Sequence, residues 1–182
     1  GVGAYGKVFG DEGANMVNMS IYDAYQGLDT GLIDCSQGYS YAVAALKQAE
    51  VMDNYTLLNW GQVGGLGIFM NKDMFDSLTS DQQHVLTATG EEMSDEFGRM
   101  ITTANDNAIA AMKEQGVEII ELPDAERMKL VDAGQKFLAE WVDTANATGL
   151  PGQKLLDDYQ ALIVKYTAER DTNGYPWTAK NN

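Results

Sequence analysis

The sequence predicts an α/β fold, and three observations support this prediction. Short apolar segments with the two-residue period of strands alternate with helical segments in the first part of the chain. Residues 79–116 carry apolar side chains at a spacing of three and four residues without a proline, which predicts a long helix. The 182 residues are 45% hydrophobic and 21% charged, a balance typical of a globular chain that buries a core in one domain or two small ones.

The chain is strongly acidic, and this excludes several classes of partner. Twelve Lys and Arg residues against 27 Asp and Glu residues give a formal net charge of −15, so nucleic acid and anionic lipid surfaces would be repelled. The longest apolar run, residues 63–70, is interrupted by glycines and is far shorter than the roughly 18 residues that a membrane-spanning helix needs. We therefore expect no binding to nucleic acid and no direct insertion into a membrane.

The first elements are expected to be short. Residues 15–19 have the period of a strand. Ser20 is a typical residue for a helix N-terminus, so a helix is expected over residues 21–30. A brief buried strand over residues 32–34 and a second helix over residues 39–51 follow.

Two further strands are expected over residues 55–58 and 66–70. The junction between them, residues 60–65, contains three glycines, which permit either a sharp turn or a close approach of the backbone to another group. An ordinary turn and a ligand contact are both compatible with this junction.

The predicted long helix has recognisable ends. Ser80 begins a pattern that resembles a capping box, and Gly116 is a suitable stop. At 1.5 Å per residue, about 35 helical residues would extend roughly 50 Å, more than the diameter of a small domain. This length favours one helix that lies across two lobes; the alternative is two helices separated by a break at Gly98.

The last third of the chain is expected to be mostly helical. A strand over residues 117–121 precedes a helix over residues 123–147. A final helix over residues 154–169 has a continuous apolar face, and the aromatic tail at residues 173–177 is expected to form a turn.

Candidates for catalysis and metal binding are few. A hydrolase would depend on Cys35 or His84, but Cys35 has no basic cluster in its vicinity in the sequence and is expected to be a small buried residue, while His84 is expected to face solvent. The acidic pairs are interpreted as solvated helix faces, and neither a calcium-binding loop nor a multi-histidine metal site is present. The glycines at positions 1, 3 and 6 match a phosphate-binding pattern only superficially. We expect no enzyme, no cofactor and no metal.

Two turns at the ends of predicted strands combine polar and aromatic side chains. In open α/β sheets, ligands collect at the carboxyl ends of strands, so these turns predict a site for a small organic solute. The alternative is that Tyr39 and Trp60 are packing residues. The polar and aromatic residues of the two turns are Ser36, Gln37, Tyr39, Trp60 and Gln62.

The order of several short motifs resembles one known family. The segments are GANMVNM at residues 13–19, YDAYQGLDTGLID at 22–34, YTLLNW at 55–60, NK at 71–72 and LTSDQQ at 78–83. Together they resemble the extracytoplasmic solute-binding subunits of TRAP transporters, the DctP family. The resemblance covers nearly the whole chain.

The resemblance implies a two-lobed fold of the periplasmic binding protein type, with a long helix between the lobes. It implies a second-lobe α/β segment at residues 1–60, a crossing strand and inter-lobe helix at residues 61–116, and a returning strand with C-terminal helices at residues 117–182. An N-terminal lobe, with the arginine that holds the ligand carboxylate, is expected before Gly1. Family pocket positions match Ile21, Gly38 and Trp60, whereas Ser36, Gln37, Tyr39 and Gln62 are added because they are near these positions.

The function that the resemblance implies is binding of a small organic anion, such as a dicarboxylate, in the periplasm and its delivery to a TRAP membrane permease. Gly38 and Cys35 depart from the family pattern, so the ligand is not assigned. Two other functions stay open: a hydrolase that uses Cys35 or His84, and a stand-alone helical interaction module whose docking element is the aromatic tail at residues 175–177.

Overall fold

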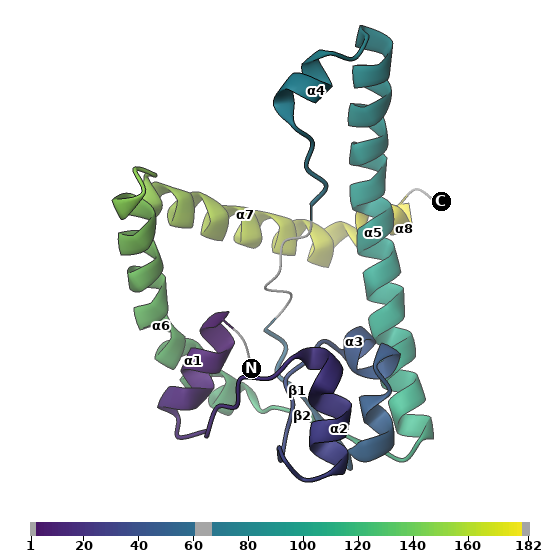
Figure 1. Cartoon of the computed structure of the whole chain (residues 1–182), viewed down its shortest axis with the longest axis vertical. Coiled ribbons are helices and arrows are strands. Elements are labelled where there is room, and N and C mark those ends of the chain that lie inside the picture. Colours follow the sequence, from purple (N-terminus) through teal and green to yellow (C-terminus); the bar gives the residue numbers. More distant parts are fainter. Residues whose placement is uncertain (1–2, 61–66, 180–182) are drawn as a thin grey trace.

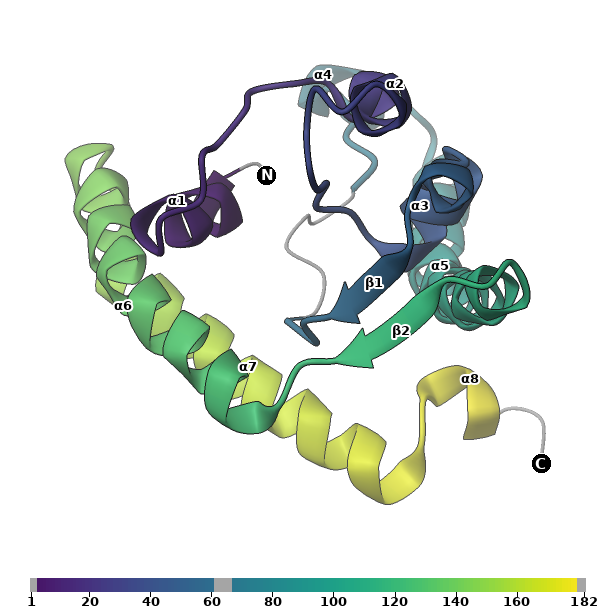
Figure 2. The same cartoon turned by 90° about the horizontal axis from the view of Figure 1, so that it is seen from below.

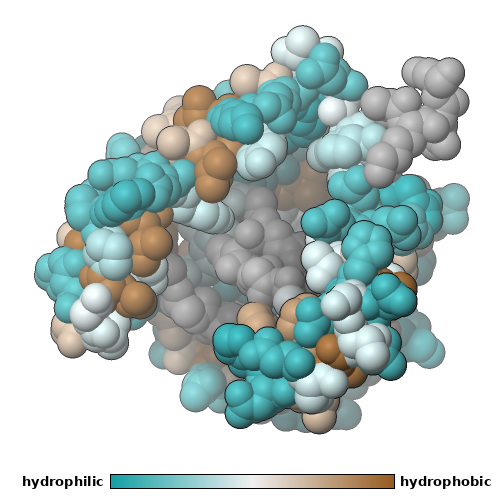
Figure 3. All heavy atoms as spheres, turned by 90° about the horizontal axis from the view of Figure 1, so that it is seen from above, coloured by the Kyte–Doolittle hydropathy of each residue, from teal (hydrophilic) through white to brown (hydrophobic). Residues whose placement is uncertain are grey.

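Three long helices form an open frame around a small α/β body (Figure 1). The computed structural model describes residues 3–60 and 67–179. The frame consists of α5 (Ser80–Glu114), α6 (Asp124–Ala147) and α7 (Gly152–Asn173). Figure 3 views the molecule from the side that carries α4 (Lys72–Asp76) and shows apolar residues, in brown, on several surfaces around the centre.

The sheet of the described part of the chain has two parallel strands, β1 (Asn54–Leu57) and β2 (Glu118–Glu121). Asn54 pairs with Glu118, and the two strands run side by side in Figure 2. Parallel strands need a long crossover connection, and here the connection contains the whole of α5. Both strands were predicted from the sequence, and both predictions are confirmed to within one residue at each end.

The core lies where the C-terminal half of α5 meets the elements before β1. These elements are α3 (Ser40–Ala45) and the 3-10 helix η2 (Gln48–Val51). Met112 of α5 is completely buried and packs in one cluster with Val43 of α3. This cluster attaches the residues that precede β1 to the long helix.

The long helix α5 is unbroken over 35 residues, so the alternative of a break at Gly98 is wrong. Its capping box begins one residue earlier than predicted: the Thr79 hydroxyl accepts a hydrogen bond from the Gln82 N–H at 3.3 Å, and the Gln82 side chain accepts one from the Thr79 N–H at 2.9 Å. Gly116 follows the helix with φ 88°, a left-handed conformation that glycine adopts without strain.

Three predicted strands are wrong. No strand forms in three of the predicted segments. These are residues 15–19, residues 32–34 and, of the strand predicted over residues 66–70, the described residues 67–70. A strand needs a neighbour that satisfies its backbone groups, and β1 and β2 pair with each other. The Ile33 N–H instead donates to the Gly27 carbonyl at 3.1 Å and closes the turn after α2 (Ala24–Asp29). Ile68 and Phe69 are 86% and 93% exposed.

Both predicted early helices are divided in the structure. Over residues 21–30, a short 3-10 helix, η1 (Ile21–Asp23), precedes α2, and the Ser20 hydroxyl accepts a hydrogen bond from the Tyr22 N–H at 3.3 Å. Over residues 39–51, Lys47 at φ 57° separates α3 from η2. A left-handed residue cannot continue an α-helix, and the change of direction allows Gln48 to be buried.

The C-terminal helices follow the prediction, with longer bounds for α7 and one correction. The tail was expected to form a turn, but it forms the short helix α8 (Pro176–Ala179), which lies beside α5 in Figures 1 and 2. The ring of Trp177 packs on Gly98 of α5. The tail is therefore occupied within its own chain, which argues against a stand-alone docking element.

The apolar residues of α7 are largely exposed, although their spacing suggested one buried face. Since α7 spans the open side of the frame, much of its surface has no neighbouring element (Figure 1). The exposed apolar residues of α7 are Leu155, Tyr159, Leu162, Ile163, Val164 and Tyr166.

Candidate functional site

Trp60, three residues after β1, lies in an aromatic cluster with α1 (Gly3–Asp11). Its ring stacks with Tyr5 at 4.7 Å between centroids and with Phe9 at 5.6 Å, both at 24°. Tyr5 and Phe9 are four residues apart on one helix and therefore share a face. The Tyr5 hydroxyl also donates to the Trp60 carbonyl at 3.4 Å. The cluster thus attaches the end of the β1 segment to α1.

The segment before α3 is held by hydrogen bonds to two other elements. The Tyr55 hydroxyl of β1 donates to the Gly38 carbonyl at 2.9 Å. Asn105 of α5 accepts hydrogen bonds with its side-chain oxygen from the Ser40 hydroxyl and, at 3.3 Å, from the Tyr41 N–H. Because both ends of residues 38–41 are attached in this way, their backbone is positioned before any ligand binds.

Tyr5 connects the aromatic cluster to this segment. Burial raises the pKa of Tyr5 above its ordinary value, and the nearby phenol groups of Tyr39 and Tyr159 raise it further because phenolate charges would repel each other. Tyr39 lies in the segment before α3, where its ring stacks with Tyr41 at 5.6 Å, and Tyr159 lies on α7. Tyr39 and Tyr159 thus lie close enough to Tyr5 to act on its charge.

Two buried polar atoms in this region have no hydrogen-bond partner among the described residues. They are the side-chain oxygen of Gln37 and the indole nitrogen of Trp60. An unpaired buried polar group costs about 1–3 kcal/mol. A group that offers an acceptor to Trp60, or a donor to Gln37, would recover that cost for the atom it meets.

The structure brings some of the predicted site residues together. Trp60 and Tyr39 are both near Tyr5, and Ser36, Gln37 and Gly38 are partly buried in the segment that leads to Tyr39. Ile21 lies on η1, and 39% of its surface is exposed. Gln62 lies outside the described residues.

Sequence reasoning missed Tyr5 and Phe9. Their spacing of four residues was the available signal, but in this segment only the glycines were considered, and these match a phosphate-binding pattern only superficially. In the structure Gly3 and Gly6 belong to helix α1, not to a turn.

The residues considered for catalysis do not form a site. Cys35 is exposed, so the expectation of a buried cysteine is wrong. His84 is exposed, as predicted. It lies in the first turns of α5, at the end next to α4, whereas Cys35 lies between α2 and α3 at the opposite end of the frame (Figure 1). In the described residues, no group of three His, Cys, Asp or Glu side chains could hold a metal ion, and no helix has the length and hydropathy to cross a membrane.

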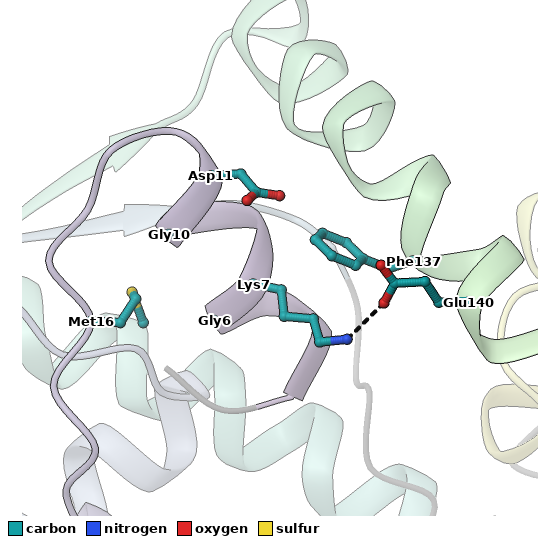
Figure 4. A pocket seen from close by; sticks show the side chains of 7 residues that line it. All are labelled: Gly6, Lys7, Gly10, Asp11, Met16, Phe137 and Glu140. Carbon is teal, nitrogen blue, oxygen red and sulfur yellow. Dashed lines mark hydrogen bonds and ion pairs between the residues drawn. The ribbon is translucent and has the colours of Figure 1, made fainter. Parts of the chain in front are cut away.

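A hollow of about 580 Å³ lies between α1 and α6 (Figure 4). Lys7 pairs with Glu140 at 2.9 Å, and Lys136 pairs with Asp11 at 2.5 Å. Both lysine nitrogens also lie 5.1 Å from the centre of the Phe137 ring. Since Lys7, which lines the hollow, and the nearby Lys136 are both already paired with carboxylates, the hollow offers little to an anionic ligand.

The family model described as "Bacterial extracellular solute-binding protein, family 7" (DctP) matches residues 2–144. The chain is 31% identical over 127 residues to the 2,3-diketo-L-gulonate-binding periplasmic protein YiaO of Escherichia coli, with 70% of this chain and 37% of that protein covered. It is 30% identical over 110 residues to the C4-dicarboxylate-binding periplasmic protein DctP of Rhodobacter capsulatus, with 60% and 33% covered. The chain thus spans about a third of the length of these relatives.

Solved structures show the same fold. A TRAP periplasmic solute-binding protein from Desulfovibrio salexigens superposes on this chain with a TM-score of 0.77 at 23% sequence identity. The match covers 96% of this chain and 53% of the other chain. A TRAP solute-binding protein from Rhodoferax ferrireducens, in complex with copurified benzoate, gives a TM-score of 0.72 at 22% identity, with 91% and 53% covered. The predicted fold class is therefore confirmed over about half of these chains.

Proposed function

This chain belongs to the DctP family, family 7 of the bacterial extracellular solute-binding proteins, and we propose that its protein binds a small organic carboxylate and delivers it to a TRAP-type membrane permease. Solute-binding proteins of this family are non-enzymatic components of transport, so the expectation that the chain is not an enzyme is confirmed. The observation that carries the proposal is the buried indole N–H of Trp60, which has no hydrogen-bond partner among the described residues and lies in an aromatic cluster with α1.

The ligand class follows from what the relatives hold. The similar structures include one with bound malonate, one with copurified benzoate and one with bound β-D-galacturonate. These three molecules differ in shape but share a carboxylate. We assign a carboxylate to this protein for that reason, and we place its binding in the periplasm, as the names of the curated relatives suggest.

The proposed contacts are the residues after β1 and before α3, with Ile21 as a further contact. The three arginines in the chain each pair with a neighbouring acidic residue on the same helix. The proposal assigns the role of holding the carboxylate to none of these three arginines. The proposal also keeps α5 as the connection between the two lobes. It keeps residues 1–60 as a second-lobe segment, residues 61–116 as the crossing strand and inter-lobe helix, and residues 117–182 as the returning strand and C-terminal helices. The proposed contact residues are Ile21, Ser36, Gln37, Gly38, Tyr39, Trp60 and Gln62.

Calorimetric titration of the full-length protein tests the proposal. The panel contains malonate, succinate, L-malate, benzoate, 3-hydroxybenzoate and D-galacturonate. We expect at least one to bind, and Trp60→Ala to weaken that binding by at least about tenfold because both the ring and its N–H are lost. The matched control is Trp141→Ala, since Trp141 lies on α6 and is 46% exposed. The absence of any binding, or equal losses in the two variants, would contradict the proposal.

A further inference from the structure

The end of β1 is fixed by the sheet. β1 pairs with β2 as far as Leu57 and Glu121, and the Leu122 N–H donates to the Leu57 carbonyl at 3.3 Å. The backbone of β1 is therefore held by β2 up to its last residue. The direction in which the chain continues is set by the few residues between Leu57 and Trp60.

Helix α1, on which Trp60 stacks, is fixed separately on α6. Val8 is 4% exposed, and a Cβ at Gly134 of α6 would lie 3.7 Å from one of its methyl groups, so the two helices pack closely. Figure 4 shows the ion pair between Lys7 of α1 and Glu140 of α6. Because α1 is held in this way, a change in the direction of the chain after β1 would move Trp60 away from it.

One residue between these two fixed points has an unusual backbone conformation. Asn59, directly before Trp60, has φ 53°, in the left-handed region. Residues other than glycine are uncommon in this region, although asparagine enters it more readily than most. The side chain of Asn59 is exposed. What distinguishes this position is therefore its backbone conformation and not the packing of its side chain.

We propose that Asn59 positions Trp60 for ligand binding: its left-handed backbone turns the chain at the end of β1, so that the Trp60 ring stacks on α1. This inference rests on the proposed function, in which Trp60 is a ligand contact. Asn59 acts through Trp60 and not through a contact of its own. Glycine, which adopts positive φ without strain, should therefore replace Asn59, whereas a β-branched residue should not.

The first experiment follows Trp60 in the full-length protein without ligand. Fluorotryptophan is incorporated, and the fluorine NMR signal of Trp60 is identified by its loss in Trp60→Phe. The chemical shift of this signal depends on the rings of Tyr5 and Phe9, which stack on Trp60. Asn59→Gly should leave the signal in place, and Asn59→Val should move it toward the frequency of free fluorotryptophan.

The second experiment measures binding by calorimetric titration. The ligand is whichever of the six carboxylates named above the wild-type protein binds most tightly. Asn59→Val should weaken its binding by at least about tenfold, like the loss of Trp60 itself, because the contact is misplaced. Asn59→Gly should bind as tightly as the wild-type protein. If thermal unfolding shows that Asn59→Val does not fold, Asn59→Ala takes its place, since alanine also disfavours positive φ.

Lys47 provides a matched control. Like Asn59, it is an exposed residue other than glycine with positive φ, at 57°, and it lies between α3 and η2. Lys47→Val should lower the melting temperature, as Asn59→Val does, but leave the Trp60 signal and the affinity unchanged. If the left-handed position mattered only for stability, both valine variants would affect binding alike.

The outcomes separate the inference from the function on which it rests. The inference is overturned if Asn59→Val keeps the Trp60 signal or the affinity of the wild-type protein, or if Asn59→Gly loses as much as Asn59→Val. Carboxylate binding by the wild-type protein then still stands. If none of the six carboxylates binds to the wild-type protein, the proposed function fails, and the binding role of Asn59 fails with it.

Discussion

The six-membered ring of Trp177 lies directly against Gly98 of the long helix. A Cβ atom at position 98 would be 2.7 Å from Cζ3 of the ring and 2.9 Å from Cη2. Tyr175 stacks on Trp177 with 4.6 Å between centroids and an angle of 8°, so two aromatic rings of the tail stack together at this contact. Through this contact the C-terminal tail packs against the middle of α5, so the tail connects the end of α7 to α5.

This contact makes Gly98 and Gly90 behave differently, although both lie inside α5. Gly90→Ala should stabilise the protein by about 0.5–1 kcal/mol, because alanine favours helix and nothing lies within 4 Å of its Cβ. Gly98→Ala should gain the same helix propensity but displace Trp177, which costs about 1–3 kcal/mol. Urea unfolding of both variants measures the difference. If the two alanines stabilise equally, the tail does not pack on α5.

The start of α5 gives a second prediction. Thr79→Ala removes the hydroxyl group of the observed capping box and should lower the free energy of unfolding by about 1 kcal/mol. Ser80→Ala, at the position that the sequence suggested, should change it by less than about 0.5 kcal/mol. Denaturant unfolding distinguishes them, and a larger loss in the Ser80 variant would show that the cap is at Ser80.

The attachment of α3 to α5 depends on Asn105. Asn105→Ala leaves the buried Ser40 hydroxyl group and the Tyr41 N–H without their acceptor, so we expect a loss of about 1–3 kcal/mol in stability. Asn107→Ala, two residues further on and exposed, is the matched control and should lose less than about 0.5 kcal/mol. Equal losses in thermal unfolding would mean that the hydrogen bonds at Asn105 do not hold α3.

Two partly buried tyrosines, Tyr5 and Tyr55, predict how stability depends on alkaline pH. Burial raises the pKa of Tyr55 above 10.0, and burial together with the Tyr39 and Tyr159 phenols does the same for Tyr5. A pKa that is higher in the folded than in the unfolded protein gives a stabilisation that is fully present below pH 10 and is lost as the pH rises through the folded value. Melting temperatures should therefore fall more steeply above pH 10 in the wild-type protein than in Tyr55→Phe. Parallel curves would contradict this.

Part of the candidate site could be predicted from the sequence. Trp60 and Tyr39 were identified because polar and aromatic residues follow predicted elements, and the structure brings both near Tyr5. Tyr5 and Phe9 could not be assigned, since their partner Trp60 is more than 50 residues away in the chain and no local pattern records that contact. The unpaired state of the Gln37 oxygen is equally a property of its surroundings.

The sequence by itself determined the elements whose signals are local: α5, α6 and α7 through their apolar period and glycine or proline boundaries, and the two strands beside them. Only the tertiary structure decided which extended segments found a neighbour, where Lys47 ended α3, and where Trp177 packed. The physical reason is that a helix satisfies its hydrogen bonds within a few residues, whereas strand pairing, burial and ring stacking depend on groups that are distant in the chain.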